Sequence, residues 1–130
     1  NGLAIGADTV VVWQGKILTK PNDPRAAAGI LDAIQGQTVE VITGLALYNI
    51  QSKSLWQASE STLVSIVELT QEQIARYVQT GEPLGKAGAF AIQGLGAVLV
   101  KQIQGDYSNV VGLPLHALSQ GLQYFKISVL

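Results

Sequence analysis

Residues 38–68 read TVEVITGLALYNIQSKSLWQASESTLVSIVE, and this stretch decides the fold. Its first part alternates with a period of two, so one face would carry Val39, Val41, Thr43, Leu45 and Leu47. A polar cluster at residues 51–54 interrupts the alternation, and a second strand-like run extends from Leu55 to Glu68. Because two strands joined by a short turn must run antiparallel, the stretch predicts a long two-stranded ribbon.

The segments on either side of the ribbon predict a hairpin, several helices and a further strand. Residues 3–13 are rich in Val and Ile, and Gln14-Gly15 separates them from the short apolar run 16–18, which is typical of a β-hairpin. The remaining segments expected are a helix capped by Asn22 and ended by Gly36, a helix from a capping box at Thr70 to Gly81, a glycine-rich connection over 82–96, a strand over 97–103, a loop over 105–112 and a helix from Pro114 at its first position to about Tyr124. Helices and strands interleave, so we expect one α/β domain with a mixed sheet and flanking helices.

Composition limits the classes of function that are open to the chain. Its 130 residues are 48% hydrophobic and 13% charged, which suits one folded domain. A net charge of −1 provides no basic field for duplex nucleic acid or an anionic membrane, and no apolar run reaches the ~18 residues that span a bilayer. With no Cys and one His, a metal would have to bind oxygen ligands. The cytoplasm is the expected location, and because the chain has no Met we expect it to be a fragment of a longer protein.

Asp8 is the first candidate for chemistry, because it interrupts the most apolar strand of the chain, Ile5 to Val11. A carboxylate buried there without a partner would cost several kcal/mol or become protonated. Two interpretations stay open. Asp8 is either a general base or metal ligand mounted on a rigid strand, or a structural residue that bonds to a neighbouring turn.

Two lysines and a glutamine are candidates for contacts to a ligand. Lys20 precedes Pro21, which favours an extended backbone, and its ammonium would meet a phosphate or lie in solvent. Lys86 lies among glycines, whose missing side chains allow the backbone and a substrate to approach each other closely. Residues 81–87 nevertheless do not match a phosphate-binding P-loop. Gln93 would either read a base edge through its amide or stabilise a turn. The residue pattern by itself names no reaction.

Taken in order, six blocks of the sequence resemble the Maf family of nucleoside triphosphate pyrophosphatases. They are residues 6–11, 18–21, 43–44, 77–83, 86–94 and 105–114. The resemblance runs through essentially the whole chain. It implies an α/β domain in which two lobes flank a central cleft, related to inosine triphosphatases, and a possible homodimer.

The resemblance also implies an activity, which is hydrolysis of a nucleoside triphosphate to the monophosphate and pyrophosphate with a divalent metal, Mg²⁺ or Mn²⁺. By motif position, Asp8 resembles the proton acceptor that activates water. Thr9 and Gln93 resemble specificity positions, and Lys20 and Lys86 resemble contacts to the polyphosphate. The sequence around Gln93 is similar to the branch that acts on dTTP and UTP, whereas the branch that acts on 7-methyl-GTP usually has Glu there. The resemblance assigns no metal ligand.

The chain departs from the family pattern in three places. The family opens with a strand and a Ser-x-Ser-Pro-Arg-Arg loop that grips the triphosphate, and an Asp commonly stands where this chain has Gly85. A His is common in the family's strand before Thr43-Gly44, where this chain has Val39, and this change should affect only local packing. We therefore read residues 1–130 as a single Maf-like domain without the opening strand and loop, and expect it to hydrolyse poorly alone. The alternatives are a non-catalytic nucleotide-binding or septum-regulating module, and an inert folding unit with an unpaired sheet edge.

Overall fold

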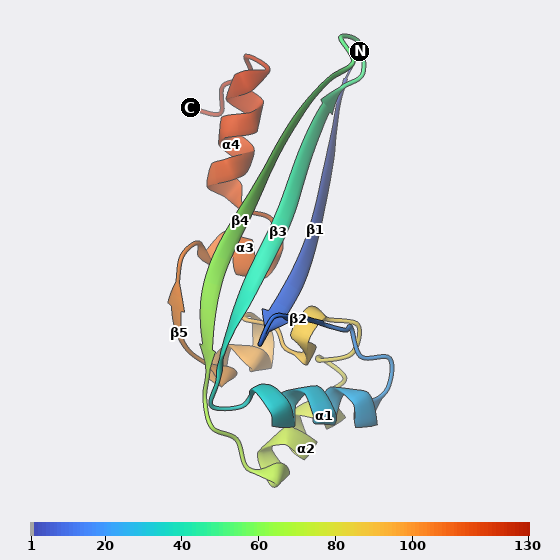
Figure 1. The fold of residues 1–130 in the computed structure, drawn as a ribbon, viewed down its shortest axis with the longest axis vertical. Coiled ribbons are helices and arrows are strands. Elements are labelled where there is room, and N and C mark those ends of the chain that lie inside the picture. The colour runs from blue at the N-terminus through green and yellow to red at the C-terminus, as the bar shows by residue number, and fades with distance from the viewer. Residues whose placement is uncertain (1) are drawn as a thin grey trace.

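A computed structural model describes residues 2–130, and its central element is a five-stranded sheet with strand order β2-β1-β3-β4-β5 (Figure 1). The strands are β1 (Leu3–Trp13), β2 (Lys16–Leu18), β3 (Thr38–Asn49), β4 (Ser54–Ile66) and β5 (Val100–Gln104). The helices are α1 (Pro24–Ile34), α2 (Gln71–Gln79), α3 (Tyr107–Val111) and α4 (Leu115–Tyr124), with 3-10 segments η1 (Ala87–Ala89) and η2 (Gly94–Leu99).

The predicted ribbon is present as β3 and β4, paired from Thr38 with Ser65 to Asn49 with Ser54. The side chains expected on one face, those of the period-two pattern in β3, are buried. At the turn, the Asn49 side chain accepts hydrogen bonds from the backbone N–H of Gln51 and Ser52, both at 3.0 Å. Alternating hydrophobicity therefore located the longest element of the fold and assigned its buried face correctly.

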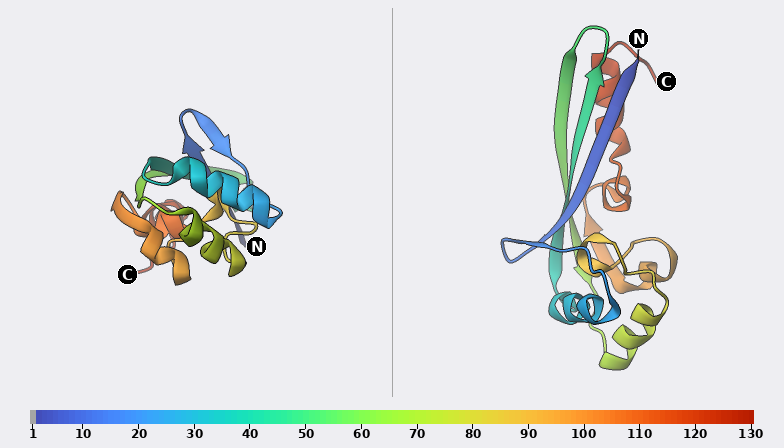
Figure 2. Two further views of the ribbon diagram at one scale, coloured as in Figure 1. Left: turned by 90° about the horizontal axis from the view of Figure 1, so that it is seen from below. Right: turned by 90° about the vertical axis from the view of Figure 1, so that its right-hand side faces the viewer.

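The α/β class with flanking helices is confirmed, and the sheet differs from the expected mixed type in its strand directions. All four ladders found within residues 2–130 are antiparallel. The reason is visible in Figures 1 and 2, where α1 and α2 lie beyond one end of the sheet instead of crossing its face. A helix in that position does not connect parallel strands.

Several element boundaries differ from the sequence expectation. Asp23, and not Asn22, caps α1, since its carboxylate accepts from the N–H of Ala26 at 2.8 Å. The predicted strand 97–103 begins only at residue 100, after η2, and the predicted loop 105–112 contains α3. Pro114 is the N-cap of α4 instead of its first residue. The capping box of Thr70 and Gln73 is confirmed.

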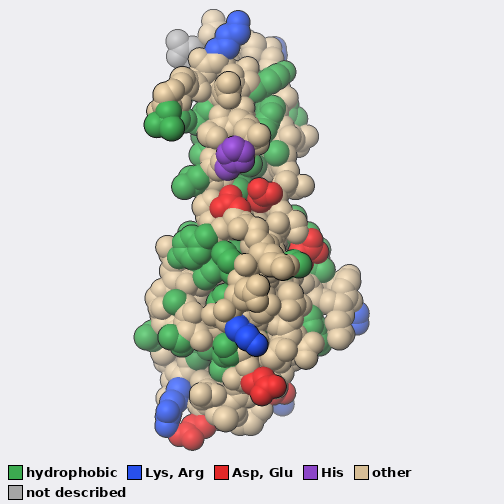
Figure 3. Space-filling model, turned by 90° about the vertical axis from the view of Figure 1, so that its left-hand side faces the viewer, with side chains coloured by type: hydrophobic (Ala, Val, Ile, Leu, Met, Phe, Trp, Pro, Cys, Tyr) green, Lys and Arg blue, Asp and Glu red, His purple; other side chains and the backbone are tan. Residues whose placement is uncertain are grey.

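Residues 2–130 form two hydrophobic clusters, and these define two lobes. The lower lobe packs α1, α2 and η1 against one end of the sheet, and the upper lobe packs α4 against the far half of the ribbon (Figures 1 and 2). Figure 3 shows the narrow upper lobe standing on the broader lower lobe. In the upper lobe, Gly121 of α4 leaves room for the Trp56 ring, because a Cβ there would lie 2.6 Å from two ring carbons. Trp56 thus anchors the packing of the upper lobe.

Candidate functional site

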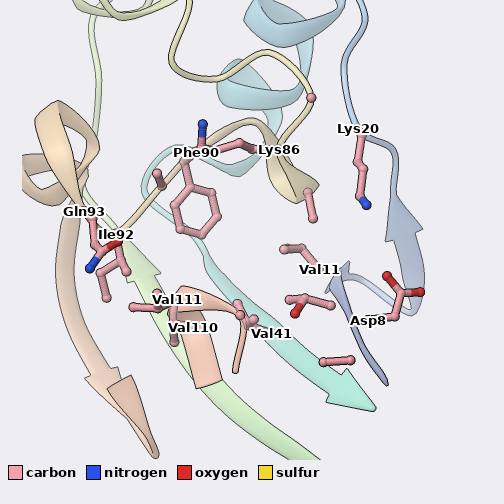
Figure 4. A pocket seen from close by; sticks show the side chains of 16 residues that line it. Asp8, Val11, Lys20, Val41, Lys86, Phe90, Ile92, Gln93, Val110 and Val111 are labelled. Carbon is pink, nitrogen blue, oxygen red and sulfur yellow. The ribbon is translucent and has the colours of Figure 1, made fainter. Parts of the chain in front are cut away.

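A cavity of about 380 Å³ lies where β1 and β3 meet the loop before η2 and the end of α3 (Figure 4). Its lining includes all of the residues that the sequence analysis selected, namely Asp8, Thr9, Lys20, Lys86 and Gln93. In Figure 4, Asp8 and Lys20 lie on one side, Gln93 lies on the opposite side, and apolar side chains lie between them. The fold therefore brings together residues from four separate segments of the chain.

Asp8 lines the pocket and is exposed, although its strand is the most apolar in the sequence. The physical reason is its place at the edge of the sheet. β1 pairs with β2 only through Val11–Trp13, whereas it pairs with β3 from Leu3 onwards. Opposite Asp8 on β3 stands Gly44, which adds no side chain. The carboxylate is therefore accessible to solvent. Within residues 2–130 it makes no side-chain hydrogen bond to a turn, so the structural interpretation has no support.

Thr9 is the neighbour of Asp8, and its hydroxyl faces the interior of the sheet. It shares a 2.8 Å hydrogen bond with the hydroxyl of Thr43, which in turn donates to the backbone carbonyl of Asn109 at 3.3 Å. The Asn109 side chain is fully buried, and its amide nitrogen donates to Thr62 Oγ1 at 3.0 Å and to the carbonyl oxygens of Val41 and Glu60, both at 3.1 Å. This polar network holds α3 against β3 and β4, and so fixes one wall of the pocket.

The two lysines reach the pocket from loops that are bonded to each other. Lys20 is exposed and lies on the Asp8 side in Figure 4, and the carbonyl of the next residue, Pro21, accepts from the N–H of Gly85 at 2.8 Å. Gly85 has φ 74°, a conformation that favours glycine, so the residue found in place of the family's Asp serves this backbone contact. Lys86 follows it, and its ammonium donates to the Glu82 carbonyl at 2.9 Å.

Gln93 lies at the N-cap position of η2, with an exposed side chain that makes no capping hydrogen bond. The turn-stabilising interpretation of Gln93 therefore has no support, and its amide is free to face a ligand. Between Gln93 and Asp8, the pocket is floored by buried Phe90 and Val11. Gly88 permits this floor, since a Cβ there would lie 3.1 Å from Val11 and 3.2 Å from the Phe90 ring.

The residues described offer no protein cage for a metal. Nowhere in residues 2–130 do three or more His, Cys, Asp or Glu side chains gather closely enough to hold an ion, and the pocket contains a single carboxylate, that of Asp8. The divalent metal implied by the resemblance would therefore not be held by these side chains alone. In the same part of the chain, each helix is too short or too polar to cross a membrane.

Sequence reasoning missed Tyr77 and Glu82, which lie behind the wall that carries Gln93. The Tyr77 hydroxyl donates to the Glu82 carboxylate at 2.7 Å, and Glu82 also accepts from the N–H groups of Gly96 at 2.8 Å and Leu95 at 3.1 Å. Partial burial opposes ionisation of Glu82, but these hydrogen bonds and the Lys86 charge outweigh it and lower its pKa. Burial and the bond to Glu82 raise the pKa of Tyr77. The one available signal was the glycine pair flanking Leu95, which allows such close contact.

Comparison with known proteins gives consistent results. The family model described as Maf-like protein matches residues 1–125. The dTTP/UTP pyrophosphatase of Pelotomaculum thermopropionicum is 48% identical over 130 residues, which are 100% of this chain and 68% of that protein. The dTTP/UTP pyrophosphatase of Methanosarcina mazei is 47% identical over 129 residues, 99% of this chain and 66% of that protein. That of Ruminiclostridium cellulolyticum is 46% identical over 123 residues, 95% of this chain and 64% of that protein. The chain thus spans about two thirds of the length of these relatives.

Proposed function

Because the chain belongs to the Maf-like protein family, we propose that it is a nucleoside triphosphate pyrophosphatase that hydrolyses dTTP and UTP to the monophosphate and pyrophosphate. The observation that carries the proposal is the meeting of one solvent-accessible carboxylate, two lysines and one unpaired amide around a single cavity of about 380 Å³. That volume suits a ligand of nucleotide size. The similar proteins are named dTTP/UTP pyrophosphatases, which supports the same activity.

The chemical step that this pocket suits is attack of water on the α-phosphorus. A bond forms between the water oxygen and the α-phosphorus, and the bond from that phosphorus to the oxygen that bridges to the β-phosphate breaks. Asp8 accepts the proton that the water loses, and the electron pair of the broken bond leaves with pyrophosphate. Lys20 and Lys86 neutralise charge on the departing pyrophosphate. Lys86 has three N–H donors, of which one is bonded to Glu82, so two are available for phosphate oxygens.

We propose that the base is selected by Gln93, on the side of the pocket opposite Asp8 and Lys20. The Gln93 amide both donates and accepts, which matches the alternating carbonyl and imide N–H groups of uracil and thymine. Thr9 lies on β1 and supports the wall formed by α3, because its hydroxyl bonds to Thr43, which in turn donates to the Asn109 carbonyl. The apolar floor formed by Phe90 and Val11 would face the uncharged part of the nucleotide.

The divalent metal, the cellular location and the oligomeric state are also proposals. We propose that the substrate is the Mg²⁺ or Mn²⁺ complex of the triphosphate, with the ion held mainly by phosphate oxygens and water, since the pocket has only one carboxylate. The expected location is the cytoplasm, in keeping with a chain that has no Cys. A homodimer, implied by the family resemblance, is likewise proposed.

The direct test is a product assay with the protein expressed together with any upstream residues that its gene encodes. Incubation with dTTP or UTP and Mg²⁺ should release pyrophosphate and the monophosphate, detected by phosphorus NMR, and a chelator should stop the reaction. Release of orthophosphate, or no release, would contradict the proposal. Nucleotide binding by calorimetry without any product would instead support the non-catalytic module. The 130-residue chain alone is expected to be ~100-fold slower, as for loss of a cationic or N–H contact to the reacting group.

A further inference from the structure

Two side chains that do not line the pocket tie down the segment that carries Gln93. We call this pair, Tyr77 and Glu82, the clasp. The Tyr77 hydroxyl accepts from the N–H of Ala91 at 3.2 Å and donates to Glu82 Oε1 at 2.7 Å. Glu82 then accepts from Leu95 and Gly96 at 3.1 and 2.8 Å. The bonds thus fall on both sides of Gln93, two residues before it and two and three residues after it.

The backbone on the C-terminal side of Gln93 packs closely against the Tyr77 and Glu82 side chains. A Cβ added at Gly94 would lie 2.6 Å from Glu82 Oε2, and one added at Gly96 would lie 2.6 Å from the Tyr77 hydroxyl and 2.8 Å from Glu82 Oε1. Real Cβ atoms do not approach other atoms this closely, so a residue larger than glycine would push the carboxylate away. Gly94 also has φ 66°, which favours glycine. The clasp therefore accounts for Gly94, and at Gly96 it acts together with the Ala91 carbonyl oxygen, which would lie 2.1 Å from an added Cβ.

The backbone of Glu82 also contacts the lysine on the phosphate side of the pocket. The Glu82 carbonyl accepts from the Lys86 ammonium at 2.9 Å, while its carboxylate holds residues 95 and 96. Glu82 is thus bonded at once to the lysine expected to contact phosphate and to the segment that presents Gln93. The Tyr77 ring is 6% exposed and sits in the lower core, so the clasp is anchored to α2.

The charges around the clasp favour a single protonation state. The groups that face Glu82 are the Tyr77 hydroxyl of α2, the Lys86 ammonium, and the N–H groups that begin η2. All of them stabilise an ionised carboxylate, and the pKa of Glu82 is lowered accordingly. Hydrogen bonds to an ionised group are stronger than neutral ones, so the clasp stiffens a segment that has little regular structure of its own.

We propose that the Tyr77 and Glu82 side chains are positioning residues for nucleotide selection, which act by fixing the segment that presents Gln93 to the base. The inference rests on the proposed function and deepens it. A recognition side chain discriminates only when its backbone is held in place, because a loose segment adjusts to the wrong base at little cost. The clasp therefore contributes to the choice between nucleotides as well as to the stability of the lower lobe.

The test uses Tyr77→Phe, which removes the hydroxyl and keeps the buried ring, with Glu82→Gln as a second variant. The matched control is Glu72→Gln, which breaks the exposed ion pair with Arg76 on the same helix. The readout is the ratio of kcat/KM for UTP to that for CTP, whose base presents a different edge. We expect the ratio to fall about tenfold in Tyr77→Phe and to stay unchanged in the control. In a Gln93→Ala background, Tyr77→Phe should cause no further fall.

Amide hydrogen exchange provides a readout that does not depend on hydrolysis. The N–H groups of Ala91, Leu95 and Gly96 should exchange faster in Tyr77→Phe than in the wild-type protein. Unchanged exchange would overturn the inference, and so would faster exchange with an unchanged UTP to CTP ratio, or an effect that adds fully to that of Gln93→Ala. If the wild-type protein hydrolyses no nucleotide, the proposed function fails, and exchange alone decides whether the clasp holds the Gln93 segment.

Discussion

The Asp8 carboxylate and the Lys20 ammonium reach the pocket from backbones that are fixed independently of any ligand. Asp8 stands on a strand paired with Gly44, and Lys20 precedes a buried proline whose carbonyl bonds to Gly85. The side chains themselves stay exposed. A binding site needs charged groups that are held by a rigid backbone and are exposed to solvent, because such groups can then bind a ligand instead of another side chain.

Lys20→Ala should lower kcat/KM for UTP by ~100-fold, because the variant removes a cation from the leaving pyrophosphate. Steady-state pyrophosphate release measures the effect. Lys16→Ala is the matched control, since Lys16 is also exposed and lies on the nearby strand β2 but outside the pocket lining. Equal activities of the Lys20 and Lys16 variants would remove Lys20 from the site.

The clasp predicts how the free energy of unfolding depends on pH. The pKa of Glu82 is lowered from 4.5, so its contribution is present above about pH 4.5 and is lost as pH falls through the lower, folded-state value. The pKa of Tyr77 is raised from 10.0, so its contribution is present below about pH 10 and is lost as pH rises beyond that value. Urea unfolding at several pH values should show a shallower acid limb in Glu82→Gln than in Glu72→Gln. Parallel acid limbs in the two variants would contradict the assignment.

Helices and strands with a clear hydrophobic periodicity could be predicted from the sequence. A short helix that depends on a single capping residue could not. The ribbon follows from alternation in 38–47, and α1 and α2 follow from apolar residues at helical spacing. By contrast, α3 has only five residues and forms because Asp106 accepts from the Ser108 N–H and Gly112 ends the turn at φ 126°. A segment this short has no periodicity, so the sequence predicts a loop over 105–112 in its place.

The contact between α4 and the ribbon depends on one glycine. Gly121→Ala should lower the free energy of unfolding by about 1–3 kcal/mol, because the new Cβ meets the Trp56 ring at 2.6 Å. Gly29→Ala is the control within α1, where a Cβ meets nothing within 4 Å, and it should instead stabilise the protein by about 0.5–1 kcal/mol. Urea denaturation of both variants measures the difference. A Gly121 variant as stable as the Gly29 variant would show that α4 does not pack as described.

At the scale of the described chain, residues 2–130, the antiparallel sheet joins two hydrophobic clusters, and the pocket is lined by Val11, Val41 and Phe90 of the lower cluster together with the end of α3. Asp8, Lys20, Lys86 and Gln93 are up to 85 positions apart in sequence, and their meeting followed from the family resemblance rather than from spacing. The clasp could not be predicted. It depends on how closely Glu82 approaches the backbone at 94–96, and no periodic pattern encodes that approach. The α/β class could be predicted from the sequence pattern, and the two lobes from the family resemblance. The strand directions could not be predicted.

The most direct measurement compares pyrophosphate release by Asp8→Asn with release by the wild-type protein. The control is Asp32→Asn, which changes an exposed carboxylate of α1 that accepts a hydrogen bond from Gln71. Loss of the proton acceptor should reduce kcat for UTP by about 10²–10⁴-fold, while calorimetry shows that UTP still binds and the Asp32 variant keeps its activity. Pyrophosphate release by Asp8→Asn at the wild-type rate would contradict the role of this pocket in hydrolysis.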